Sequence, residues 1–139
     1  IKDVLLRFKG ELWTQDIPAA SKYGLNLVEG DKAEGLGRNK IHYGANGGYQ
    51  AINLAYLFGA KKITLLGFDM KRGENNKSHW HGDHPGELNK DMPIRTWVKN
   101  FCKLAEDLKS EQVEVINSTR DTALECFNKI KLEVALCLN

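Results

Sequence analysis

Histidines and one aspartate crowd into a short segment near the middle of the chain. His79, His81, Asp83 and His84 lie within six residues of one another. Imidazole is well suited to general-base catalysis near neutral pH, and it is also a common ligand for zinc and similar metals. The segment therefore predicts catalytic histidines at His79, His81 and His84, and a metal site formed by His79, His81 and Asp83.

Three interpretations of this histidine segment stay open. The spacing H-x-H-x-D-H is that of metallo-β-lactamase-type hydrolases, but those enzymes need further histidine and aspartate ligands downstream, and no histidine follows His84. A single bound metal or a catalytic histidine needs fewer partners. The third interpretation is structural, with the histidines and Trp80 holding a long loop in place by hydrogen bonds and stacking.

A glycine-rich turn precedes a predicted helix. Glycine lets the backbone approach a ligand closely, and the free amides and dipole of a first helical turn favour an anion. Asn46, Gly47 and Gly48 are therefore predicted to bind a phosphate or diphosphate. The alternative is that the two glycines only form a tight turn, because the segment matches neither a Walker loop nor the GxGxxG dinucleotide motif.

Two further polar residues come directly after predicted strands. Asp69 follows the apolar run Ile63–Gly67, where a carboxylate can bind a hydroxyl, a ribose or Mg²⁺. Its alternative role is that of a turn or N-cap aspartate. Ser118 follows a second predicted strand and is a candidate ligand contact, although a hydroxyl there also suits the cap of a following helix.

The elements that must position these residues alternate between strand and helix. Short apolar segments predict strands at Leu25–Val28, Ile41–Tyr43, Ile63–Gly67 and Val113–Ile116. Helical spacing of apolar residues predicts helices over Tyr49–Phe58, from Pro93 to Leu108 and over Thr122–Leu138, with Gly59 as a left-handed cap. The glycine- and charge-rich segment Gly30–Lys40 is predicted to be a solvated loop. Asp69–Asn89 is predicted to be a long loop, and loops of that length are usually functional or disordered.

This alternation is typical of an α/β domain with a mainly parallel sheet and right-handed crossovers. Ligands of such sheets bind beyond the carboxyl ends of the strands. The segments Gly44–Gly48, Asp69–His84 and Asn117–Thr119 each follow a predicted strand. We therefore expect all three to gather on one edge of the sheet.

Composition narrows the class of protein. The 139 residues, 42% of them apolar, suit a single domain over 1–139. The 20 basic and 18 acidic residues are scattered, which argues against a nucleic-acid partner. Three cysteines without paired spacing indicate a reducing compartment, and no apolar run reaches the roughly 18 residues of a membrane span. We expect a cytoplasmic protein without a membrane partner.

Three motifs in order carry a resemblance to known families: Asn46–Ala51 (NGGYQA), Gly59–Ile63 (GAKKI) and Leu66–Asp69 (LGFD). With the later histidine-rich loop, they resemble a group of tailed-bacteriophage proteins sometimes labelled norphogenetic proteins, over nearly the whole chain. More distantly, the chain is similar to the MptE-like 6-hydroxymethylpterin diphosphokinases and the family 42 sialyltransferases. The resemblance implies a three-layer Rossmann-like domain and, for a phage protein, the host cytoplasm.

In the two enzyme groups this region faces the phosphates of a nucleotide or nucleotide sugar. The resemblance therefore implies a transferase-like domain for glycosyl or diphosphate transfer, with Mg²⁺ or another divalent metal as a cofactor. The implied nucleotide-binding residues are Asn46, Gly47, Gly48, Gln50, Asp69 and Ser118. One of the three loop histidines would act as the base.

Two departures from the family pattern keep alternatives open. Gly47 stands where the relatives usually have serine, and their N-terminal half, with its own glycine-rich strand end, has no counterpart here. We therefore expect a piece of a longer family domain, completed by the other half or by homo-oligomerisation. The alternative functions are a non-catalytic phage accessory or morphogenetic protein that keeps the fold, and a metal-dependent hydrolase built on the histidine segment.

Overall fold

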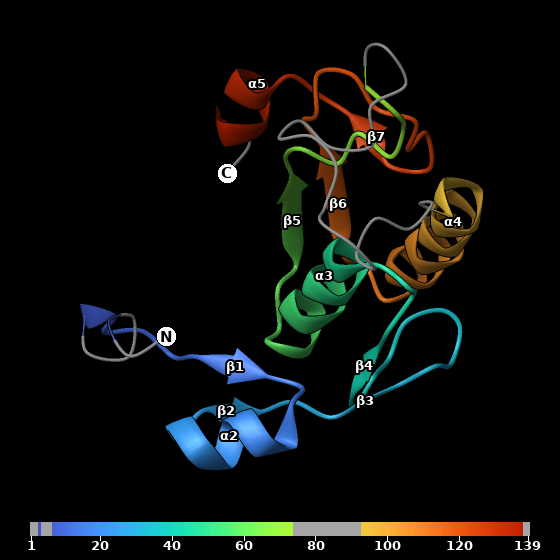
Figure 1. Ribbon diagram of the computed structural model, residues 1–139. Coiled ribbons are helices and arrows are strands. Elements are labelled where there is room, and N and C mark those ends of the chain that lie inside the picture. The colour runs from blue at the N-terminus through green and yellow to red at the C-terminus, as the bar shows by residue number, and fades with distance from the viewer. Residues whose placement is uncertain (1–2, 4–6, 74–92, 138–139) are drawn as a thin grey trace.

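The computed structural model describes residues 3, 7–73 and 93–137 and shows a mixed α/β architecture (Figure 1). The elements follow in the order β1 (Trp13–Thr14), α2 (Ile17–Tyr23), β2 (Asn26–Leu27), β3 (Gly30–Asp31), β4 (Ile41–His42), α3 (Gly47–Leu57), β5 (Lys62–Leu65), α4 (Ile94–Ser110), β6 (Glu114–Asn117), β7 (Asn128–Lys129) and α5 (Leu132–Cys137). The predicted metal and catalytic residues His79, His81, Asp83 and His84 lie outside the described residues.

The main sheet has three parallel strands in the order β5-β6-β7. In its register Lys62 pairs with Glu114 and Leu65 with Asn117. Two smaller parallel pairs, β1-β2 and β3-β4, lie apart from it. The prediction of parallel strands with intervening helices is confirmed, but β4 pairs with β3 and not with β5. The expectation that the glycine turn follows a strand of the main sheet is therefore wrong.

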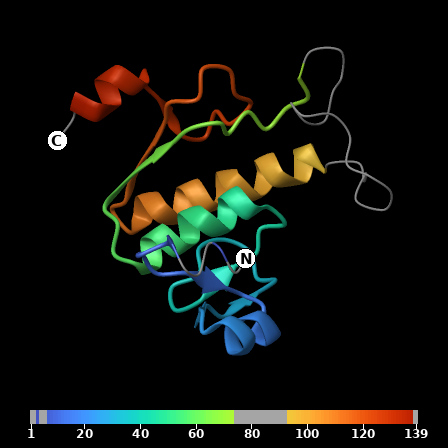
Figure 2. The same cartoon turned by 60° about the vertical axis from the view of Figure 1, so that its left-hand side comes forward.

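Helices α3 and α4 run side by side against one face of the main sheet (Figure 2). The apolar residues of α4 recur at helical spacing, so Phe101, Leu104 and Leu108 fall on one stripe and are almost fully buried. The ring of Phe101 meets those of Tyr49 and Phe127 edge to face, with centroids 5.6 and 6.3 Å away. This stripe is the centre of the hydrophobic core.

The end of α3 confirms the prediction for Gly59. This glycine has a φ of 84°, and its N–H donates to the carbonyl of Tyr56 at 2.8 Å. The next amide, of Ala60, reaches back to the carbonyl of Ala55 at 3.0 Å. Such a left-handed glycine closes the last helical turn and redirects the chain, here into β5.

The helix predicted over Thr122–Leu138 is confirmed only for its last part and is wrong for the residues before α5. The chain instead forms a loop, then β7, then the short helix α5. The buried Asn117 side chain donates to the Leu124 carbonyl at 3.5 Å, and the Thr122 hydroxyl donates to the Phe68 carbonyl at 2.6 Å. These bonds tie the loop to two strand ends, so Leu124 reaches the core from a loop and no helix is needed to bury it.

The segment Gly30–Lys40 is also less solvated than its composition indicates. Its middle, residues 35–37, is buried. Asn53 of α3 is fully buried and accepts the N–H of Gly37 at 3.0 Å while donating to the carbonyl of Gly37 at 2.8 Å. The amide of Leu36 donates to the Asp107 carboxylate at 2.9 Å. Long-range hydrogen bonds thus bury a stretch that looks like a surface loop.

Candidate functional site

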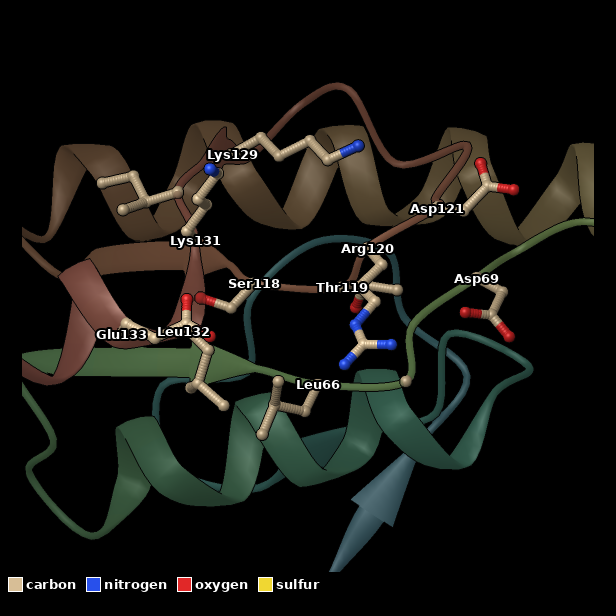
Figure 3. A pocket seen from close by; sticks show the side chains of 12 residues that line it. Leu66, Asp69, Ser118, Thr119, Arg120, Asp121, Lys129, Lys131, Leu132 and Glu133 are labelled. Carbon is tan, nitrogen blue, oxygen red and sulfur yellow. The ribbon is translucent and has the colours of Figure 1, made fainter.

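A cavity of about 950 Å³ opens at the carboxyl ends of β5, β6 and β7 (Figure 3). Its lining residues come from the three strand ends and the start of α5, and are Leu66, Gly67, Asp69, Ser118, Thr119, Arg120, Asp121, Lys129, Ile130, Lys131, Leu132 and Glu133. Parallel sheets characteristically bind ligands at this edge. Two of the predicted binding residues, Asp69 and Ser118, therefore share one cavity.

Asp69 is held in position through its backbone neighbours. The amide of Phe68 donates to the Thr119 hydroxyl at 3.0 Å, and the carbonyl of Phe68 accepts from the Thr122 hydroxyl at 2.6 Å. The carbonyl of Asp69 itself accepts the N–H of Ala123 at 2.8 Å. The loop after β6 thus fixes the backbone at the end of β5, and the exposed carboxylate of Asp69 stays available at the cavity.

Ser118 has an unusual combination of burial and missing partners. The residue is only 8% exposed, and its hydroxyl has no hydrogen-bond partner among the described residues. In Figure 3 the hydroxyl is directed toward the first turn of α5, where Leu132 and Glu133 lie. An unsatisfied buried polar group costs about 1–3 kcal/mol. A ligand oxygen that bonded to this hydroxyl would recover that cost.

Three cations line the same cavity. Arg120, Lys129 and Lys131 are exposed, and none of them forms an ion pair with a carboxylate in the described parts of the chain. Figure 3 shows the Arg120 guanidinium between the side chains of Ser118 and Asp69. Positive charge without an internal counterion favours an anionic ligand.

The rim of the cavity also carries negative charge. Asp121 forms an ion pair with Lys71, and this hydrogen bond holds the pKa of the Asp121 carboxyl below its ordinary value. Lys129 lowers the same pKa further through its charge. Asp121 is therefore ionised at neutral pH and forms its ion pair with Lys71. The cations Arg120, Lys129 and Lys131 on the cavity wall can then bind an anionic ligand.

Sequence reasoning missed the three cations. A helix over Thr122–Leu138 would put Lys129 and Lys131 on a helix surface, away from the strand ends. The available signal was Arg120, which comes two residues after Ser118 beyond the same predicted strand. The strand β7 brings the two lysines to the cavity. It has only two residues and no apolar pattern, so it could not be predicted from the sequence.

The predicted phosphate-binding residues of the glycine turn lie elsewhere. The Asn46 side chain caps α3 and accepts the amides of Gly48 at 2.9 Å and Tyr49 at 3.3 Å. The Gln50 side chain donates to the Tyr43 carbonyl at 3.1 Å. Two amides that a phosphate would use at this helix start, those of Gly48 and Tyr49, are therefore already bonded to the protein.

Phe68 separates the two groups of predicted residues. Its ring packs so closely on Gly48 that a Cβ there would lie 2.6 Å from the ring. A second cavity, of about 490 Å³, lies beside the turn and includes Gly44, Ala45 and Lys99 in its lining. Asp69 and Ser118 thus line the larger cavity, whereas Asn46, Gly47, Gly48 and Gln50 line neither of these two cavities.

Comparison with known proteins adds no family assignment. No protein-family model, curated protein or solved structure matches this chain significantly. Within residues 3, 7–73 and 93–137, no three His, Cys, Asp or Glu side chains are grouped so that they could hold a metal ion. None of the helices in these ranges combines the length and hydrophobicity needed to cross a bilayer. Function must therefore be argued from the chemistry of the cavity.

Proposed function

We propose that this chain is a nucleotide- or nucleotide-sugar-binding domain of the transferase type, acting in glycosyl or diphosphate transfer. The observation that carries the proposal is the buried hydroxyl of Ser118, which has no partner in the described parts of the chain and lies beside three cations at the carboxyl end of a parallel sheet. Phosphate groups supply the charge and the hydrogen-bond acceptors that this combination lacks.

The cations and the hydroxyl have complementary roles in this proposal. The guanidinium of Arg120 bonds two phosphate oxygens at once, while Lys129 and Lys131 act as point charges. The Ser118 hydroxyl donates to a further phosphate oxygen. The cavity volume of about 950 Å³ is at the upper end of the range for small-molecule sites, roughly 300–1,000 Å³, and so has room for a nucleotide with a second group attached.

Asp69 lines the same cavity and binds the part of the ligand outside the phosphates, or its metal ion. Its carboxylate binds a ribose hydroxyl, or a Mg²⁺ ion that also contacts the phosphates. The histidine segment begins ten residues further along the chain. In this proposal one of His79, His81 and His84 takes the proton from the acceptor hydroxyl.

The proposal extends to the complete fold and its origin. α3 and α4 cover one face of the main sheet, and Thr64 and Leu66 of the β5 segment are exposed. An uncovered strand of this kind is what a three-layer Rossmann-like domain without one of its parts would leave. The resemblance to tailed-phage proteins supports, within this proposal, a phage origin and a location in the host cytoplasm.

Calorimetry tests the binding step directly. The ligands are CMP, CDP, UDP, ATP and their sugar conjugates, each with and without Mg²⁺. We expect at least one diphosphate to bind, and Lys131→Glu to weaken it at least tenfold, about 1.4 kcal/mol. Lys99→Glu, which alters the second cavity, is the matched control and should leave affinity unchanged. If no nucleotide bound, the proposal would be wrong. A larger loss of nucleotide affinity in Lys99→Glu than in Lys131→Glu would indicate that the binding site is the second cavity, beside the glycine turn.

Turnover is tested separately from binding. We expect His81→Ala to abolish transfer while nucleotide affinity stays within about twofold, because a general base contributes roughly 10²–10⁴-fold to rate and little to ground-state binding. His42→Ala is the control outside the segment. Binding without transfer in the unaltered protein would instead identify a phage accessory protein that has kept the fold and lost catalysis.

A further inference from the structure

Two of the three cysteines are distant in the sequence and meet in the fold. Cys102 lies on α4, and Cys126 lies in the turn just before β7. Burial, hydrogen bonding to the Cys102 thiol and the charge of Cys102 together hold the pKa of the Cys126 thiol well above its ordinary value. A thiol is a weak, short-range hydrogen-bonding group, so this effect requires the two sulfurs to be neighbours.

The residues next to the two cysteines hold them in this position. Phe101 precedes Cys102, Phe127 follows Cys126, and the two rings meet edge to face with centroids 6.3 Å apart. Cys126 itself packs against the hydrophobic core, to which the nearby Leu124 belongs. Because a packed core moves little, the approach of the two sulfurs is part of the fold and does not depend on a surface segment.

We propose that Cys102 and Cys126 are a modification site, at which a peroxide oxidises the two thiols to a reversible disulfide that joins α4 to the loop after β6. Both residues are partly exposed, so a small oxidant can reach them. The partner of each cysteine is the other one, already beside it. In a reducing compartment such a bond is transient, which suits a response to oxidant.

The chemistry begins at Cys102. Its charge is among the causes that raise the pKa of Cys126, so Cys102 loses its proton before Cys126 does. The Cys102 thiolate attacks one oxygen of the peroxide, the O–O bond breaks, and a sulfenic acid and hydroxide form. The hydroxide takes up a proton from solvent and becomes water.

Cys126 then completes the bond. Its sulfur attacks the sulfenic sulfur of Cys102, the S–O bond breaks, and the departing hydroxide takes the Cys126 proton to leave as a second water. In total, two thiols are oxidised to one disulfide, and one hydrogen peroxide is reduced to two waters. Cys126 is therefore the resolving thiol, which stays protonated until the sulfenic acid has formed.

The disulfide would act on the loop that borders the large cavity. This loop begins beyond Ser118 and leads into β7, and it carries Arg120 near its start and Lys129 at its end. All three residues line the cavity. A covalent bond from Cys126 to α4 would therefore restrict the loop between two sets of cavity residues, whichever ligand the cavity binds.

Peptide mapping without reductant tests the site. After hydrogen peroxide treatment of the folded chain, we expect a peptide that joins Cys102 to Cys126, with two hydrogen atoms lost, and dithiothreitol should restore both thiols. Cys137→Ser is the matched control and should form the same bond, since Cys137 lies at the exposed end of α5. In Cys126→Ser, Cys102 should proceed to the sulfinic acid, because no resolving thiol stops it.

Hydrogen exchange tests the effect on the loop. We expect the amides between Asp121 and Phe127 to exchange at least roughly tenfold more slowly in the oxidised chain, because opening of the loop is restricted. The amides of α2 should be unaffected. Cys102→Ser treated with the same peroxide should show no slowing, which separates the disulfide from other oxidation.

Four results would overturn the proposal. The first is that the folded chain keeps both thiols under peroxide and forms the bond only in urea. The second is a bond from Cys102 or Cys126 to Cys137 in place of the expected one. The third is a Cys126→Ser protein in which Cys102 stays a thiol, since Cys102 would then not be the attacking group. The fourth is a disulfide that leaves exchange of the loop amides unchanged.

Discussion

The glycine turn before α3 and the cavity beyond β5, β6 and β7 both present polar groups at a backbone turn, yet their hydrogen bonding differs. At the turn, the Asn46 side chain already bonds the amides of Gly48 and Tyr49. In the cavity, the Ser118 hydroxyl is buried without a partner among the described residues. Polar groups that form hydrogen bonds within the protein stabilise the fold. A buried polar group without such a bond is where a ligand gains most from forming a hydrogen bond.

The two regions also differ in steric freedom. Gly44 has a φ of 52°, and a Cβ there would lie 2.2 Å from the ring of Tyr49. Arg120 and Lys131 in the cavity are exposed. Substitutions at the turn should therefore act on folding, and substitutions in the cavity should act on binding. Four experiments test this difference between folding and binding.

The largest effect is expected at Gly44. Gly44→Ala adds a side chain at a left-handed φ and forces it against the Tyr49 ring, which should lower the free energy of unfolding by about 3 kcal/mol. The matched control is Gly47→Ala, because a Cβ at Gly47 meets no atom within 4 Å. That change should leave stability within roughly 1 kcal/mol or raise it, since alanine favours a helix. Equal losses in urea denaturation would contradict the steric argument.

The next effect concerns Ser118. Removing the hydroxyl in Ser118→Ala takes away a buried group that no described residue bonds, so stability should stay level or rise slightly. Affinity for the best nucleotide should fall about tenfold, since a hydrogen bond to a charged group is worth roughly 1.5–3 kcal/mol. Thermal unfolding and calorimetry on the same sample separate the two quantities. A loss of stability with unchanged affinity would assign the hydroxyl a purely structural role.

Asn46 should behave in the opposite way. Asn46→Ala removes the cap of α3 and should destabilise the protein by about 1 kcal/mol. Asn46→Asp keeps a capping oxygen and is the conservative control. Nucleotide affinity should be unchanged in both. If Asn46→Ala weakened binding as much as Ser118→Ala does, the sequence-based prediction of a phosphate site at the glycine turn would be favoured over the cavity.

The smallest effect is a pH dependence. Burial by itself would raise the pKa of Asp107, but hydrogen bonds from Lys103 and from the amide of Leu36 outweigh it and leave the pKa below its ordinary 3.8. A lowered folded pKa means that the stabilisation is present above pH 3.8 and is lost as the pH falls through the lowered value. Asp107→Asn should therefore flatten the acid loss of stability measured by denaturation at several pH values.

Asp121 is the comparison residue for this measurement. Its pKa is also lowered, by the ion pair with Lys71, but both side chains are exposed. Exposed ion pairs contribute little to stability because water screens them. Asp121→Asn should consequently leave the acid limb almost unchanged. A larger effect in Asp121→Asn than in Asp107→Asn would show that the cavity rim, and not the contact of α4 with the Leu36 amide, carries the acid sensitivity.

Local features of this chain could be predicted from its sequence alone. Helical spacing located α3 and α4, the apolar runs located β5 and β6, and Gly59 was identified as the left-handed residue after α3. Each of these predictions depends on residues that are close to one another in the sequence. Asp69 and Ser118 were selected because they follow strands, and strand ends are the usual ligand edge of parallel sheets.

Tertiary structure alone decided how these parts meet. The bond from the Phe68 amide to the Thr119 hydroxyl joins residues 51 positions apart, and the bond from Leu36 to Asp107 spans 71. Such contacts stabilise a loop and β7 where the apolar pattern predicted a helix over Thr122–Leu138. They also bring Lys129 and Lys131 to the cavity. Local periodicity determines which elements form, while hydrogen bonds and packing between distant residues determine which side chains share a site.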